Sequence, residues 1–321
     1  MKAITCDRYG LWDILKFEDV AKPSPDPDEV LIKIKAASVN SWDFEMMRGI
    51  PHIYRMAGLR RPQYRILGAD VAGIVEELGE KVTRFKVGDA VFGDLNESSW
   101  GGYAEFTTAK ESELTAKPDF ISFENASALP QAGVMAYQGI FDHGNVEHGQ
   151  KVLLNGAGGG VGSYAVQLAK YLGAEVTGVD DARKHQVMLD WGCDYVLDYK
   201  KADFTKQGIQ YDFILDMQMW RPLRHCRRAI KKGGKYSVVG GSLRKIASCF
   251  FFDPFARPIT KKPVRVLGLK TNHHLDELLK LIEEEHLAPK IEKTYSLEDT
   301  PEAFKRITEG GAKGKLVITI S

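Results

Sequence analysis

Small residues with a fixed spacing stand near the middle of this 321-residue chain. The stretch 151–155 reads as a buried strand, and Ala157, Gly159 and Gly162 follow it in an Ala-x-Gly-x-x-Gly pattern. Small residues let a backbone turn sharply and approach a pyrophosphate, and a helix that starts there directs free N–H groups and its positive dipole end at the charge. The stretch predicts a dinucleotide-binding turn with these contact residues: Ala157, Gly158, Gly159, Gly160 and Val161.

A carboxylate and two cations follow where the adenine ribose of a dinucleotide would lie. Asp180 ends the second expected strand, and a carboxylate there accepts hydrogen bonds from ribose hydroxyls and repels a 2′-phosphate, which indicates NADH. Arg183 and Lys184 come directly after it and could clamp a 2′-phosphate, which indicates NADPH. They could equally form an exposed first helical turn. These residues leave the choice between the two cofactors open.

The second half of the chain alternates strand with helix, which is typical of a parallel sheet with right-handed crossovers. Strands are expected at 151–155, 175–179, 195–197, 211–215, 235–239 and 264–269, and helices at 161–172, 183–191 and 221–231. The expected fold class is therefore α/β, with a doubly wound sheet over 126–268. Val239 and Gly240 end the fifth strand, where ligands gather in such sheets, so we expect them near the nicotinamide.

The two ends of the chain form a second expected domain. Hydrophobic strands at 30–36, 69–78 and 89–92, separated by polar turns, predict a compact barrel-like, mostly β domain over 1–125. The final stretch is expected to return to it. It contains an amphipathic helix at 274–285, a helix opening at Pro301 with Asp299 or Thr300 as its cap, and a closing strand at 316–320 paired with N-terminal strands.

Composition narrows the class of protein. The net charge is +1, which gives no indication of a nucleic-acid or membrane partner. The four cysteines are far apart and form no Cys-x-x-Cys pair, which argues against structural zinc and disulfides and favours a reducing cytoplasm. We see neither a signal peptide nor an apolar run of roughly 18 residues. A soluble cytoplasmic protein is expected.

Five motifs resemble those of the medium-chain dehydrogenase/reductase superfamily, and they span essentially the whole chain. They are Gly-Ala-Asp-Val-Ala-Gly at 68–73, Val-Gly-Asp-Ala-Val-Phe-Gly at 87–93, Gly-Gly-Tyr-Ala-Glu-Phe at 101–106, the glycine-rich turn at 156–162 with Gln-Leu-Ala-Lys at 167–170, and Gly-Lys-Leu-Val at 314–317. The resemblance implies a GroES-like catalytic domain made of 1–125 and 269–321, beside a Rossmann cofactor domain at 126–268. It also implies a homodimer.

The branch of the superfamily is indicated by residues that differ from the zinc enzymes. Zinc alcohol dehydrogenases carry a Cys-x-x-Asp pattern, and this chain has Asn40 and Asp43 in those places. The histidine of their Gly-His-Glu motif is Ala69 here, and the third ligand falls near Ala132. A zinc site needs three or four nitrogen or sulfur ligands, so no metal is expected. The chain resembles the zinc-independent quinone oxidoreductases, which have the Asn-x-x-Asp form.

This resemblance implies a reaction. Without a metal, charge developing on the acceptor oxygen must be met by hydrogen-bond donors or a proton, which quinones and α,β-unsaturated carbonyls tolerate better than simple ketones. We expect NAD(P)H-dependent reduction of such a small molecule, with NADPH slightly favoured by the relatives. The expected catalytic residues are Asn40, Tyr54 and His52. Tyr199 resembles a family tyrosine beside the cofactor's adenosine end.

Structural alternatives exist for each of these roles. Asn40 could cap a turn, His52 and Tyr54 could pack on a loop surface, and Tyr199 could pack at a strand end. The aromatic connection at 248–255 could line the acceptor site, seal a dimer or fill the core. A 2-enoyl-thioester reductase is a second possible function, although Pro51 stands where such relatives place a tyrosine. A low-turnover cofactor-binding or structural protein is a third.

Overall fold

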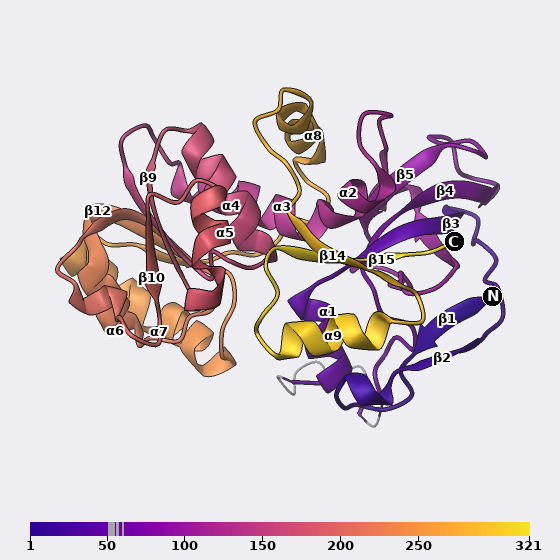
Figure 1. Ribbon diagram of the computed structural model, residues 1–321, viewed down its shortest axis with the longest axis horizontal. Helices are drawn as coiled ribbons and strands as arrows, with labels where there is room; N and C mark the ends of the chain where they lie inside the picture. The colour runs from indigo at the N-terminus through magenta and orange to yellow at the C-terminus, as the bar shows by residue number, and fades with distance from the viewer. Residues whose placement is uncertain (51–54, 56–57, 60) are drawn as a thin grey trace. The chain divides into compact units, whose positions relative to one another are not determined.

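The structure is a computed structural model that describes residues 1–50, 55, 58–59 and 61–321 (Figure 1). The chain divides into two compact units. The first consists of Met1–Ala132, Thr271–Leu275 and Ile291–Ser321, and the second of Gly133–Lys270 and Asp276–Lys290. Within the described ranges, no helix combines the length and the apolar character that a bilayer crossing requires.

The first unit is built on a mostly antiparallel sheet in the strand order β14-β15-β3-β4-β5-β7, with β6 also paired to β3. Its strands are β3 (Glu29–Val39), β4 (Asp70–Leu78), β5 (Ala90–Asp94), β6 (Phe106–Lys110), β7 (Thr115–Ala116), β14 (Ile291–Ser296) and β15 (Lys315–Thr319). The short strands β1 (Lys2–Thr5) and β2 (Lys16–Asp19) pair separately. The expected closing strand is confirmed, because β15 pairs antiparallel with β3.

Helices complete this unit, with large buried side chains between them and the sheet. They are α1 (Ser41–Arg48), α2 (Phe123–Ala128), the beginning of α3 (Pro130–Tyr137) and α9 (Thr300–Thr308). Tyr103 and Phe304 are fully buried and meet edge to face with ring centroids 5.7 Å apart. Asp299 is the N-cap of α9 and Pro301 lies in its first turn, as the sequence predicts.

The second unit is a six-stranded, wholly parallel sheet in the order β10-β9-β8-β11-β12-β13. Its strands are β8 (Lys151–Asn155), β9 (Glu175–Asp180), β10 (Tyr195–Asp198), β11 (Tyr211–Asp216), β12 (Ile230–Val238) and β13 (Val264–Val266). This order reverses between β8 and β11, which is the doubly wound Rossmann topology. The predicted α/β class and the six predicted strands are confirmed.

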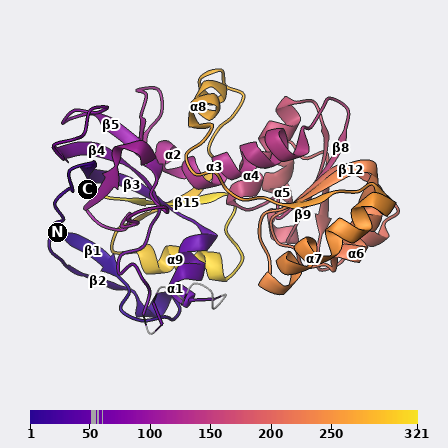
Figure 2. The same ribbon diagram turned by 180° about the vertical axis from the view of Figure 1, so that it is seen from behind.

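Helices connect these strands on both sides of the reversal. They are α4 (Gly160–Tyr171), α5 (His185–Asp190), α6 (Leu223–Cys226) and α7 (Leu243–Thr260), and α8 (Leu275–Glu283) follows the last strand. Right-handed crossovers put α4 and α5 on one face of the sheet and α6 and α7 on the other. The two pairs stand apart in both views (Figure 1, Figure 2).

Two expectations about this unit are wrong. The helix expected at 221–231 ends early, because Ile230 is already a buried strand residue that pairs with Tyr211. The aromatic stretch 248–255 belongs to helix α7 and is not a connection. Cys249 and Asp253 are buried at helical spacing, whereas Phe250 and Phe251 are 65% and 71% exposed, so these two rings do not fill the core.

Candidate functional site

The glycine-rich turn joins β8 to α4 and uses its glycines for different purposes. Gly156 has a φ of +96°, a conformation that favours glycine. A Cβ on Gly162 would lie 2.4 Å from the carbonyl oxygen of Ala157, so Gly162 lets the helix pack against the turn. A Cβ on Gly159 would meet only the carbonyl oxygen of Gly156, at 3.5 Å. Gly159 therefore borders open space.

The start of α4 is suited to an anion. Gly159 is the N-cap residue and has no side chain to offer to the first helical N–H groups. Those groups have no partner within their own helix, and the helix dipole adds positive charge at the same place. The open space beside Gly159 is thus lined by N–H donors. The five residues that the sequence predicts as turn contacts, Ala157 to Val161, come together here.

Asp180 ends β9 and turns its carboxylate toward the glycine-rich turn. One oxygen, Oδ2, accepts a hydrogen bond from the backbone N of Gly158 at 3.0 Å. The other, Oδ1, accepts one from the backbone N of Asp181 at 2.8 Å and lies 3.3 Å from Nζ of Lys184. The Lys184 side chain is only 9% exposed. Asp180 and Lys184 therefore form a largely buried ion pair that stabilises the glycine-rich turn.

Asp181 organises two cations that are much more exposed. Its carboxylate accepts hydrogen bonds from Nε of Arg183 at 2.9 Å and from Nζ of Lys200 at 2.5 Å. Hydrogen bonds from Arg183 and Lys200 hold the pKa of Asp181 far below its usual range. Arg183 and Lys200 are 59% and 56% exposed, so their outer faces are accessible to a ligand. Neither Asp181 nor Lys200 was predicted as a site residue.

The remaining predicted cofactor residues lie at the same edge of this sheet. Tyr199 directly follows β10, is 46% exposed, and donates its backbone N–H to the carbonyl of Asp180 at 3.3 Å. Val239 directly follows β12 and donates its N–H to the carbonyl of Asp216 at 2.9 Å. A Cβ on Gly240 would lie 2.8 Å from the carbonyl oxygen of Met217. All these positions follow the carboxyl ends of parallel strands.

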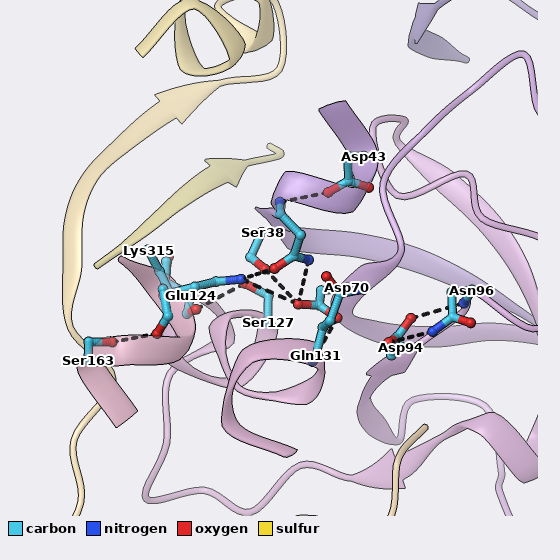
Figure 3. Close-up of polar contacts among 12 residues, drawn as sticks. Ser38, Asp43, Asp70, Asp94, Asn96, Glu124, Ser127, Gln131, Ser163 and Lys315 are labelled. Atoms are coloured by element: carbon cyan, nitrogen blue, oxygen red, sulfur yellow. Dashed lines mark hydrogen bonds and ion pairs between the residues drawn. The ribbon is translucent and has the colours of Figure 1, made fainter. Parts of the chain in front are cut away.

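The first unit holds Asn40 in a buried polar cluster around Asp70. The Oδ2 atom of Asp70 accepts hydrogen bonds from Ser38 Oγ and from Asn40 Nδ2, both at 2.9 Å. Its Oδ1 atom accepts one from the backbone N of Gln131 at 3.1 Å. Lys315 lies beside them, with Nζ 2.5 Å from Asn40 Oδ1 and 3.5 Å from Asp70 Oδ2. Figure 3 shows Ser38, Gln131 and Lys315 converging on Asp70.

Asp70 and Lys315 have opposite charges, and each affects the pKa of the other. Burial raises the pKa of Asp70, and Lys315 and the hydrogen-bond donors oppose that rise. The hydrogen bonds at Asp70 are donated by Ser38, Asn40 and the Gln131 backbone, which suits an ionised carboxylate. Burial lowers the pKa of Lys315, and the Asp70 charge opposes that fall. Asp70 and Lys315 therefore stabilise each other's charge.

Two further buried carboxyls lie near this pair. Burial raises the pKa of Asp43 to about 7, although its Oδ2 accepts a hydrogen bond from the backbone N of Asn40 at 2.7 Å. Burial and the Asp70 charge raise the pKa of Asp94 to about 8, against hydrogen bonds from Asn96. The hydrogen bond between Asp43 and the Asn40 backbone fixes the first turn of α1.

The raised pKa values of Asp43 and Asp94 predict that the protein loses stability as the pH rises toward neutral. A carboxyl whose pKa is raised in the folded state binds its proton more tightly when the protein is folded. It therefore contributes fully to the free energy of unfolding below about pH 4, and this contribution is lost as the pH rises through the folded-state pKa. The free energy of unfolding should fall between pH 4 and pH 7 by up to about 1.4 kcal/mol per pH unit for one such group. Urea unfolding across this range measures it.

A matched pair of variants identifies the group responsible. Asp43→Asn keeps an oxygen for the Asn40 N–H but cannot ionise, so the fall should become shallower. Asp19→Asn removes an exposed carboxyl whose pKa is lowered by Lys2, and should leave the slope above pH 4 unchanged. Equal slopes for the wild type and Asp43→Asn would show that Asp43 does not titrate in this range.

Two predicted catalytic residues, His52 and Tyr54, lie outside the described residues. The residues at the expected zinc positions are Asn40, Ala69 and Ala132, and both ends of the Asn40 amide are engaged by Lys315 and Asp70. No group of three histidine, cysteine, aspartate or glutamate side chains suited to a metal ion occurs in the part of the chain that the structure describes.

Comparisons with known proteins agree with this architecture. The Alcohol dehydrogenase GroES-like domain family matches residues 26–119, and the Zinc-binding dehydrogenase family matches residues 191–318. The chain is 32% identical to the chloroplastic quinone-oxidoreductase homolog of Spinacia oleracea over 99% of this chain and 98% of the relative. It is 30% identical to the 2-methylene-furan-3-one reductase of Solanum lycopersicum over 99% of this chain and 79% of the relative.

A solved structure is similar over the same extent. The mycobacterial protein Rv1454c complexed with NADPH superposes with a TM-score of 0.86 at 26% identity, covering 99% of both chains. The doubly wound sheet, the glycine-rich turn and the two family matches thus agree with one another. The chain belongs to the medium-chain dehydrogenase/reductase superfamily, in its quinone-oxidoreductase-like branch.

Proposed function

We propose that the protein is an NAD(P)H-dependent oxidoreductase that reduces a quinone or an α,β-unsaturated carbonyl compound without a metal ion. The observation that carries the proposal is the open, N–H-lined space beside Gly159 at the start of α4. Dinucleotides bind at this edge of doubly wound sheets. The two acceptor classes are supported by the names of the spinach and tomato relatives, since a 2-methylene-furan-3-one is an enone.

Each predicted residue has a distinct part in this proposal. The backbone N–H groups of Gly160 and Val161 at the start of α4 would hold the diphosphate. Ala157, Gly158 and Gly159 would form the turn that the diphosphate approaches, because their own N–H groups bond within the protein. Val239 and Gly240 would border the nicotinamide. When bound, the cofactor supplies the hydride. Asn40 would donate a hydrogen bond to the acceptor oxygen, and His52 or Tyr54 would supply the proton. A metal ion has no role in this account.

We further propose that NADPH is preferred and that Asp181 limits the preference. Arg183 and Lys200 present two exposed cations beside Tyr199, where a 2′-phosphate would be held. Asp180 is already engaged with Gly158 and Lys184, which weakens the argument for NADH. The Asp181 carboxylate, however, neutralises part of the charge of both cations and repels a phosphate.

Asp181→Asn is therefore expected to tighten NADPH binding about tenfold, equivalent to about 1.4 kcal/mol, while NADH binding stays the same. The gain should shrink as salt is added, because the cations are exposed. Fluorescence titrations with both cofactors measure it. Glu175→Gln is the matched control, since it frees Lys151 at the opposite end of the same strand. NADPH affinity that is unchanged or lower in Asp181→Asn would contradict this role.

The activity itself is tested with the wild-type protein. Steady-state oxidation of NADPH and NADH is followed with 1,4-benzoquinones and with short enals as acceptors. Consumption of a cofactor with either acceptor class, undiminished by a chelator, is the expected result. Measurable cofactor binding with no consumption by any acceptor would favour the low-turnover binding protein over the oxidoreductase.

Three further parts of the proposal concern organisation. We propose that cofactor binding belongs to 126–268 and acceptor chemistry to 1–125 with 269–321. We propose a cytoplasmic location, supported by four cysteines that are all free and buried. We also propose a homodimer, which light scattering of the purified protein would test directly.

A further inference from the structure

Lys315 is a buried cation that the proposed reaction does not use. It is the first residue of β15, and its side chain is 1% exposed. The next residue, Leu316, pairs with Val39 on β3, so the sheet brings Lys315 beside Asn40. A buried ammonium is costly unless it is paired and hydrogen-bonded. Here Asn40 Oδ1 accepts its hydrogen bond and Asp70 balances its charge.

This arrangement fixes which way the Asn40 amide points. An asparagine amide has one oxygen acceptor and one nitrogen that carries two hydrogens. The oxygen faces the Lys315 ammonium and the nitrogen faces the Asp70 carboxylate. Rotating the amide by half a turn would set N–H groups against the ammonium and the oxygen against the carboxylate, and both contacts would be repulsive.

The two charges therefore leave Asn40 with one N–H beyond its bonds to Lys315 and Asp70. Such a donor suits an oxygen on which negative charge develops. Hydrogen bonding of the amide oxygen to a cation also polarises the amide and strengthens its N–H as a donor. Asp43 and Asp94 are the other ionisable groups that act on Lys315, and each favours its charged form when ionised.

We infer that Lys315 is a positioning residue for the reduction, which acts by fixing the Asn40 amide as a hydrogen-bond donor to the acceptor oxygen. This inference rests on the proposed function, because it takes Asn40 to contact the acceptor. Lys315 itself is buried and does not need to reach it. If the ion pair were purely structural, a variant that lacks both charges but keeps its stability would also keep its kcat. Such a variant is attainable, since apolar side chains of similar size can replace a buried pair without loss of stability.

The charge-neutral double variant separates the two roles. Lys315→Met alone strands the Asp70 carboxylate and should lower both the melting temperature and kcat. Lys315→Met combined with Asp70→Asn removes both charges, so the melting temperature should largely recover while neither charge orients the Asn40 amide any longer. We expect kcat to stay at least about tenfold below wild type in the double variant, with the NADPH dissociation constant unchanged. Recovery of kcat together with stability would overturn the inference.

A second cycle tests whether Lys315 acts through Asn40. Residues that act through one another give non-additive effects. In a background of Asn40→Ala, adding the charge-neutral Lys315→Met and Asp70→Asn pair should lower kcat no further. A full additional tenfold loss would show that Lys315 acts by another route. If the wild type oxidises no cofactor with any acceptor, the proposed function fails, which is a result distinct from either outcome of these cycles.

Discussion

Gly159→Asp is expected to weaken NADPH binding by about two orders of magnitude and to leave the protein at least as stable as the wild type. The backbone of Gly159 has φ −97° and ψ −173°, an extended conformation open to any residue, and a Cβ there meets no close neighbour. Aspartate is among the preferred N-cap residues, so its carboxylate should bind the free N–H groups of α4.

The same carboxylate would occupy the space proposed for the diphosphate and repel it. Loss of two charge-assisted hydrogen bonds at about 1.5 kcal/mol each corresponds to roughly 100-fold in affinity. Fluorescence titration with NADPH and thermal unfolding of the same sample measure the two effects separately.

Two comparisons guard against other causes. Ser122→Asp adds the same charge at the N-cap of α2 in the other unit and should not change NADPH affinity. Gly162→Ala should lower stability by about 1–3 kcal/mol as well as binding, because its Cβ would overlap the carbonyl oxygen of Ala157. Unchanged NADPH affinity in Gly159→Asp would show that the diphosphate does not lie at the start of α4.

Among the single substitutions proposed here, Asp70→Asn should lower the free energy of unfolding most, by about 3–5 kcal/mol. The substitution keeps the shape of the side chain but leaves the Lys315 ammonium buried without a counter-charge. It also replaces one of two carboxylate oxygens with an amide nitrogen, so either Ser38 Oγ, which donates to Oδ2, or Gln131 N, which donates to Oδ1, faces a second donor. Urea unfolding at constant pH measures the change.

The origin of this loss can be isolated by removing the second charge. Adding Lys315→Met to Asp70→Asn should restore most of the lost stability, because no uncompensated charge remains. The exposed pair Lys22 and Glu76, whose side chains are 37% and 40% exposed, is the matched control. Glu76→Gln should cost no more than about 1 kcal/mol. A similar small cost for Asp70→Asn would mean that the buried pair contributes little.

Local patterns were enough to predict most of the fold. Strands such as β8 and β11 carry a short apolar run bounded by polar residues, and β8 has the predicted bounds. The glycine spacing predicted the turn but not the contrast between Gly159, which borders open space, and Gly162, which is packed. Such patterns are local in sequence, so one segment suffices to recognise them.

Contacts between residues that are far apart in the sequence could not be predicted from local patterns. Lys315 lies 275 residues from Asn40, and only the pairing of β15 with β3 brings them together. A lysine at the start of an otherwise apolar closing strand was the available signal. Asp181 and Lys200 were missed because their ion pair depends on the adjacency of β9 and β10. The strand start at Ile230 cannot be recognised locally, because Gly233 and Gly234 separate this residue from the apolar part of β12.

Hydride transfer without a metal ion is tested most directly by a single turnover with deuterated cofactor. Chelator-treated wild-type protein is mixed with one equivalent of NADPH, carrying hydrogen or deuterium at the transferred position, and with excess 1,4-benzoquinone or a short enal. Complete oxidation of the cofactor is expected with at least one of these acceptors, at a rate that falls on deuteration and does not depend on added zinc. Cofactor that binds yet stays reduced with both acceptors, or is oxidised only after zinc is restored, would contradict it.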